Sequence, residues 1–182
     1  MKETPLATDE QDRALVARCL ENDRDAAGAL VDRYQQRLFN VALRMLGNVQ
    51  DAEDVTQTVF LNAFHRLRSY DPRFKFFSWI YRMTLNESLN MLKRRKPTAP
   101  LEDDLDILEP GAADDRTEAE DRVGRALLGL TPNDRAVVVL RHFVSFSYQE
   151  IADVLEIPVQ TVKSRLFTAR ERLRLALAEG VR

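Results

Sequence analysis

Residues 147–175 combine a tight turn with a run of basic side chains. The tripeptide Glu156-Ile157-Pro158 separates a short segment with helical apolar spacing from a longer one that starts near Val159. Two helices joined across so short a turn are typical of a helix-turn-helix. From Lys163 to Arg174 the second segment carries five basic residues against one acidic residue. The spacing therefore predicts a second helix with one apolar face and one cationic face.

The cationic face carries the kinds of side-chain group that contact bases and phosphates in duplex DNA. Amide, hydroxyl and ammonium groups donate to or accept from base edges, while arginines pair with phosphates. The alternative is a solvated basic face on an ordinary packing helix. The Ser147–Glu150 capping signal, the short turn and the small Ala152 coincide with the basic face and favour DNA. The predicted duplex contacts are Gln160, Thr161, Lys163, Ser164, Arg165, Phe167, Thr168 and Arg170.

A second segment, Arg68 to Lys96, interleaves aromatic and basic side chains. Proteins bind single-stranded nucleic acid in this way, because rings stack on unpaired bases while cations pair with phosphates. Most aromatic residues at helical spacing belong to a core, and we expect this mainly of Phe77, Trp79 and Tyr81. We expect Tyr70 and Lys75, in or beside a polar break, to be exposed. The candidate single-strand contacts are Tyr70, Lys75, Asn86, Asn90, Lys93 and Arg94.

The elements that position these side chains are predicted to be helices throughout. Apolar residues recur at steps of three and four along residues 31–45, and similar stripes cover residues 52–67 and 78–93. With a helix near residues 12–21, this makes an N-terminal unit of about four helices. Thr131 followed by Pro132 indicates a further helix start. One turn position that usually needs a positive φ carries Glu156, a strain of about 1 kcal/mol.

The charge is distributed unevenly along the 182 residues. A net charge of −2 argues against a nucleic-acid binder when the chain is taken whole. Residues 1–96 nevertheless carry +3, residues 97–121 carry −9 and residues 122–182 carry +4. The acidic stretch also holds three prolines and is expected to be an exposed, self-repelling linker. The sequence thus predicts an all-α chain with two small helical domains, residues 1–96 and 122–182, joined by linker 97–121.

Several functional classes are excluded by composition and spacing. The only cysteine, Cys19, sits in an apolar pattern and rules out an internal disulfide, which is typical of a reducing cytosol. His65 and His142 lie far apart without cysteine partners, so no metal site is predicted. No nucleophile constellation, phosphate-binding glycine loop, signal peptide or membrane span is visible. We expect a cytoplasmic protein that is not an enzyme and has no cofactor.

The combination resembles the extracytoplasmic-function (ECF, group 4) sigma factors of bacterial RNA polymerase, in the sigma-70 family. The resemblance covers nearly the whole chain. It has an N-terminal and a C-terminal segment, which occur in the family's order on either side of the acidic linker. The N-terminal similarity lies in residues 51–64 (DAEDVTQTVFLNAF) and 77–86 (FSWIYRMTLN). The C-terminal similarity lies in residues 130–135 (LTPNDR), 147–152 (SYQEIA), 157–161 (IPVQT) and 162–173 (VKSRLFTARERL).

The resemblance implies a division of labour between the two domains. The N-terminal domain, sigma region 2, would bind the polymerase clamp and the melted −10 element. Sigma region 4, the C-terminal helix-turn-helix, would bind the −35 duplex and the polymerase flap. Carried over by position, the clamp contacts are Asp54, Gln57, Thr58 and Phe60, where relatives usually carry Glu in place of Thr58. The loop 69–76 would capture a flipped base, with Asn86 nearby.

The same carry-over makes Lys163, Ser164, Phe167 and Thr168 the −35 readers, and relatives often carry a basic residue in place of Thr168. The linker would thread the polymerase towards the RNA exit path; its alternative reading is a disordered tether. The expected partners are core RNA polymerase, promoter DNA and an anti-sigma factor that covers both polymerase-binding surfaces. Phe60, Leu61 and Phe167 are expected to be exposed apolar residues that could serve such a factor.

The favoured interpretation is a promoter-specificity subunit that directs transcription initiation by RNA polymerase. One alternative is an autonomous helix-turn-helix regulator that binds palindromic duplex DNA as a dimer without polymerase. Another is an adaptor that binds a protein and never reads DNA. The adaptor leaves the basic face of residues 163–174 unexplained.

Overall fold

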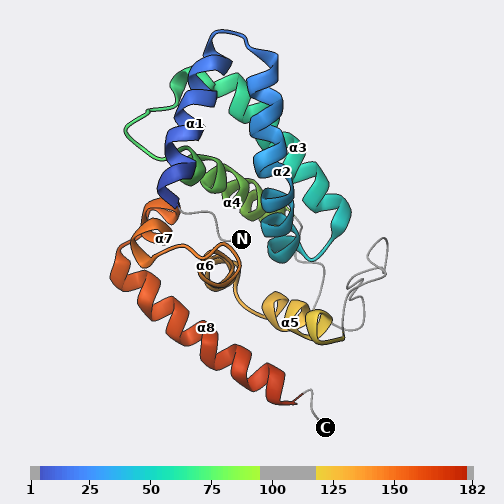
Figure 1. Cartoon of the computed structure of the whole chain (residues 1–182). Coiled ribbons are helices and arrows are strands. Elements are labelled where there is room, and N and C mark those ends of the chain that lie inside the picture. The colour runs from blue at the N-terminus through green and yellow to red at the C-terminus, as the bar shows by residue number, and fades with distance from the viewer. Residues whose placement is uncertain (1–4, 95–117, 180–182) are drawn as a thin grey trace.

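The computed structural model describes residues 5–94 and 118–179, and this part of the chain is helical without strands, which confirms the predicted all-α class (Figure 1). The N-terminal unit comprises α1 (Pro5–Leu20), α2 (Arg24–Leu46), α3 (Val49–Arg66), the 3₁₀ turn η1 (Leu67–Ser69) and α4 (Phe76–Arg94). The C-terminal unit comprises α5 (Glu118–Leu128), α6 (Pro132–His142), α7 (Tyr148–Leu155) and α8 (Val159–Glu179). The first turn of α5 overlaps the expected linker, whose residues 97–117 lie outside the described residues.

In the N-terminal unit, helix α2 is delimited by its caps and packs along its predicted stripe. The Asp23 carboxylate accepts hydrogen bonds from the N–H groups of Asp25 and Ala26, which satisfies donors that a helix start leaves free. Gly47 ends the helix with φ of 74°, a left-handed conformation that glycine adopts without strain. Val31, the first residue of the predicted stripe, is partly buried. The other predicted core residues of α2, α3 and η1 are buried: Tyr34, Leu38, Val41, Met45, Ala52, Val55, Val59, Ala63 and Leu67.

A buried polar cluster fastens α1 onto α2. The Asp12 side chain is fully buried and accepts hydrogen bonds from the Arg33 guanidinium, at 2.7 Å, and from the Tyr34 hydroxyl. Burial raises the pKa of the Asp12 carboxyl, against the opposing effect of these two donors. Because both donors come from one turn of α2, the cluster sets how α1 lies along α2.

The helix-turn-helix forms as predicted. The Ser147 hydroxyl oxygen accepts from the N–H of Glu150, and the Glu150 carboxylate accepts in return from the N–H of Ser147. Glu156 ends α7 with φ of 54°, so the expected non-glycine left-handed residue is present. The crossing of α7 and α8 buries Ile151, Ala152, Val154, Val162, Leu166 and Ala169, with Leu155 and Leu173 partly buried.

Arg135 joins the two units at the carboxyl ends of helices. Its buried guanidinium donates to the carbonyls of Leu127, Leu128 and Leu130 in its own unit, and to the carbonyl of Met45 at the end of α2. Burial lowers the pKa of Arg135 to about 10, so the group remains protonated at neutral pH. A cation suits this position because the last carbonyls of a helix carry partial negative charge.

We predict that Arg135→Met lowers the free energy of unfolding by about 3 kcal/mol, because buried carbonyls then lose a charged donor. Urea denaturation followed by circular dichroism measures the change. Arg125→Met is the matched control, since Arg125 is exposed on α5 and its replacement should change stability by less than ~0.5 kcal/mol. Equal unfolding midpoints for the two variants would contradict this role of Arg135.

Candidate nucleic-acid interface

Helix α8 runs along an outer edge of the molecule (Figure 1). Its predicted reading face is largely exposed. Phe167 is 71% exposed, and the exposed set on this helix also includes Gln160, Lys163, Ser164, Thr168 and Arg170. Thr161 and Arg165 are half-buried. The Ser164 hydroxyl donates to the Thr161 carbonyl at 3.0 Å, which keeps its oxygen available as an acceptor. The sequence therefore predicted correctly which side of α8 faces outward.

Among the described residues, the carboxylates that pair with cations of α8 lie towards its carboxyl end. Arg172 pairs with Asp134 at 3.4 Å and Arg174 with Glu171 at 3.2 Å. Within the described parts of the chain, Lys163 and Arg165 have no carboxylate partner. Two cations are thus available to DNA near the start of the helix, where the polar reading groups also lie.

His142 adds a neutral polar group beside α8. Its Nε2 lies 3.5 Å from Nη2 of Arg170. Partial burial, then the nearby Arg170 and Arg141 guanidinium groups, lower the pKa of His142. The imidazole is consequently neutral at pH 7, and the local positive charge comes from the arginines.

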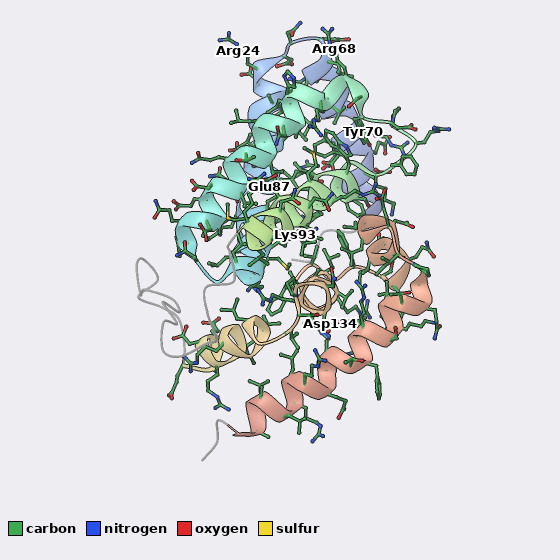
Figure 2. The ribbon with its side chains drawn as sticks, turned by 180° about the vertical axis from the view of Figure 1, so that it is seen from behind. Arg24, Arg68, Tyr70, Glu87, Lys93 and Asp134 are labelled. Carbon is green, nitrogen blue, oxygen red and sulfur yellow. The ribbon has the colours of Figure 1, made fainter. Side chains whose placement is uncertain are left out.

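The prediction that Tyr70 is exposed is wrong. Its side chain is only 8% exposed, its hydroxyl donates to the Phe74 carbonyl, and its ring packs against Phe76 and Trp79 with centroids 5.7 and 5.4 Å away (Figure 2). Burial raises its pKa to about 12. Phe74, in the same loop, is 63% exposed and is the aromatic residue available for stacking. Phe77 and Tyr81 are buried and Trp79 is partly buried, as expected.

Sequence reasoning overlooked Phe74, although a local signal was present. Asp71 turns the chain by accepting from the N–H of Arg73 with its carboxylate and from the N–H of Phe74 with its carbonyl. The carboxylate also pairs with the Arg73 guanidinium at 2.6 Å. The Asp71-Pro72 pair is a turn signal, and Phe74 is the last residue of this turn.

The remaining single-strand candidates lie along α4. Asn86, Asn90, Lys93 and Arg94 are exposed and follow one side of the helix, with Lys93 near its end (Figure 2). Lys75 is half-buried and pairs with Glu150 of α7 at 3.3 Å, so it is exposed only in part. Four of the candidates therefore share one exposed side, and Lys75 lies apart in a contact between the two units.

On α3, the exposed apolar residue differs from the expected one. Phe60 is 9% exposed and stacks against Phe64 with ring centroids 6.2 Å apart, so its expected exposure is wrong. Leu61 is 73% exposed. Asp54 and Gln57 are exposed and Thr58 is half-buried. The polar groups thus surround Leu61 rather than Phe60, because Phe60 turns towards the core.

Neither a metal centre nor a membrane span is found among the described residues. No group of three or more histidine, cysteine, aspartate or glutamate side chains there could hold a metal ion. None of the described helices is both long enough and apolar enough to cross a bilayer.

Comparison with known proteins agrees with this geometry. Residues 30–98 match sigma-70 region 2, and residues 120–173 match sigma-70 region 4. The ECF RNA polymerase sigma factor SigW of Bacillus subtilis is 32% identical over 173 residues, covering 87% of this chain and 92% of SigW. The RNA polymerase sigma-H factor of Pseudomonas aeruginosa is 33% identical over 186 residues, covering 94% and 96%.

Solved structures share the fold. CnrH in complex with the cytosolic domain of CnrY superposes with a TM-score of 0.73 at 28% identity, covering 94% of this chain and 99% of that chain. The sigma factor RpoE with the anti-sigma factor NepR from Bartonella quintana gives 0.71 at 20% identity, covering 83% and 96%.

The chain belongs to the ECF sigma factors of the sigma-70 family. Its function is promoter-specific transcription initiation with RNA polymerase, and the alternative of an autonomous dimeric regulator is not favoured.

The burial of Tyr70 and exposure of Phe74 predict opposite outcomes for two similar truncations. Tyr70→Ala should lower the free energy of unfolding by about 3 kcal/mol, because it removes a packed ring from the core. Phe74→Ala should change stability by less than ~0.5 kcal/mol. Thermal and urea denaturation of both variants provide the measurement. If Tyr70→Ala unfolded at the wild-type midpoint, its ring would not be a packed core group.

Proposed function

We propose that α8 reads the −35 element as duplex DNA while the N-terminal unit binds the melted −10 element and the polymerase clamp. The observation that carries this proposal is the open, cationic face of α8 after a capped helix-turn-helix. At the start of that face, Lys163 and Ser164 offer an ammonium donor and a hydroxyl group to base edges. Phe167 offers apolar contact to a thymine methyl group, and Arg165 and Arg170 pair with phosphates.

The −10 strand would bind along α4 and the loop before it. Asn86 and Asn90 can hydrogen-bond to exposed base edges, and Lys93 and Arg94 can pair with the sugar-phosphate backbone. Phe74 supplies the stacking surface that Tyr70, being buried, does not. Lys75 joins this surface once its carboxylate partner Glu150 moves away.

The polymerase clamp would contact α3. Leu61 provides an exposed apolar centre, and Asp54, Gln57 and Thr58 lie on the same helix as polar groups around it. Interfaces commonly combine an apolar centre with a polar rim. RNA synthesis would be catalysed by the polymerase, and this chain would act as a non-enzymatic subunit. Its place of action would be the cytoplasm. The C-terminal unit, residues 122–182, would dock on the flap.

An anti-sigma factor is the further partner that we propose. RpoE of Bartonella quintana, which shares this fold, is bound to the anti-sigma factor NepR. In this chain, Leu61 and Phe167 are large exposed apolar residues on the two surfaces assigned to polymerase and DNA. A protein that covers both residues would block binding to the polymerase and binding to the promoter at the same time.

Base readers and phosphate anchors on α8 should respond differently to mutation. In holoenzyme, Lys163→Ala should weaken promoter binding by about 2 kcal/mol and relax base preference in the −35 element. Arg165→Ala should weaken binding evenly across sequences and reduce the salt slope by about 1. Binding to −35 variants across a salt series measures both, with Arg125→Ala as a control of equal charge. Identical profiles for the two variants would contradict the assignment.

Run-off transcription tests the function as a whole. The purified chain, added to core polymerase on genomic promoter fragments, should direct discrete transcripts. Leu61→Ser should weaken core binding by about tenfold without unfolding the chain, because it removes an exposed apolar anchor. Leu20→Ser is the matched control, since Leu20 is exposed at the end of α1.

Absence of core binding by the wild-type chain would overturn the proposal. A homodimer that binds a palindrome without polymerase would instead support the autonomous regulator. Binding to polymerase without any promoter preference would support the adaptor.

A further inference from the structure

The acidic side of α7 lies against basic residues of α4. Glu150 accepts from the Lys75 ammonium at 3.3 Å, and Glu156 accepts from the Arg82 guanidinium at 2.6 Å. The same guanidinium donates to the backbone carbonyl of Asp153. Figure 1 shows α7 beside the chain segment where α4 begins. The helix-turn-helix therefore holds the N-terminal unit through its turn and first helix, while α8 faces outward.

An aromatic contact accompanies these ion pairs. Phe146, just before α7, packs between Phe77 and Tyr81 of α4, with both centroid distances 5.2 Å. Phe146 is buried in this arrangement. An apolar contact does not distinguish charged neighbours. The ion pairs beside Phe146 therefore add specificity to the contact between α7 and the start of α4.

The ionisation of Glu150 and the backbone position of Glu156 both favour these ion pairs. Partial burial raises the pKa of Glu150, but hydrogen bonds from Ser147 and the Lys75 ammonium outweigh it, so the pKa lies below its ordinary value. The carboxylate is therefore charged at neutral pH. Glu156 occupies a left-handed position that glycine would fill with less strain. Glycine, however, would leave Arg82 without its carboxylate partner.

We propose that Lys75–Glu150 and Arg82–Glu156 form an autoinhibitory latch, which holds the C-terminal unit against the start of α4 in the free chain and so occupies Lys75 of the proposed −10 surface. The functional part of this proposal rests on the −10 assignment made above. In the closed chain Lys75 is engaged by Glu150, whereas Phe167 on the −35 face remains exposed. The free chain thus presents its −35 face and withholds part of its −10 face. Such ion pairs are partly solvated and individually weak, so polymerase binding can open them.

The double variant Glu150→Gln/Glu156→Gln tests the latch in the full-length chain. Glutamine at position 150 retains the capping box, because its amide oxygen can still accept from Ser147. Small-angle X-ray scattering should show a larger radius of gyration than wild type. A short fluorescein-labelled single-stranded DNA of random sequence should bind roughly fivefold more tightly, without polymerase.

Two further variants control for charge and folding. Glu53→Gln/Glu171→Gln removes the same charge from exposed positions on α3 and α8 and should leave the radius of gyration unchanged. Glu156→Gly should open the chain in scattering while its unfolding temperature stays at or above that of wild type, because glycine relieves the left-handed strain. A compact Glu156→Gly variant would contradict a latch at this residue.

The outcomes separate the latch from the function on which it rests. A double variant as compact as wild type, with the same single-strand affinity as the control, overturns the latch. An expanded double variant without tighter single-strand binding supports the closure and overturns the −10 assignment. Expansion together with tighter binding supports both.

Discussion

The arrangement of the whole molecule depends on the buried guanidinium of Arg135. It bonds to three carbonyls of the corner between α5 and α6, and to one carbonyl at the end of α2. In the part of the chain that the structure describes, the positive charge is compensated by backbone carbonyls. The first three bonds organise the C-terminal unit by itself, whereas the bond to Met45 exists only while the two units are packed together.

Close packing at the end of α2 reinforces this corner. A Cβ at Gly47 would lie 2.6 Å from Cδ1 of Leu128, and the φ of 74° there also favours glycine. Arg44, one turn earlier, places its guanidinium 4.1 Å from the ring centroid of Phe143. The two units therefore meet at two separate places, this corner and the contact of α7 with α4.

The helices and their caps could be predicted from the sequence, because periodicity and capping are local properties. The stripe Tyr34, Leu38, Val41 and Met45 is buried as expected. Tyr70 and Phe60 were misassigned for different reasons. Tyr70 lies in a loop, where no periodicity indicates which ring turns inward, and Phe60 lies at the edge of a helical stripe. The pair Lys75–Glu150 joins residues 75 positions apart, and no local pattern predicts such a contact.

Charge segregation within the helix-turn-helix explains why net charge is a poor guide to this chain. Three of the six acidic residues between positions 122 and 182 are Glu150, Asp153 and Glu156, on α7 and its turn. The cations Lys163, Arg165 and Arg170 lie on α8. Glu150 and Glu156 pair with the basic residues Lys75 and Arg82 at the start of α4, so the negative charge of α7 is largely compensated at short range. The cations of α8 remain at least partly exposed to solvent. A duplex approaching this unit is consequently attracted to α8, which orients it before any base is read.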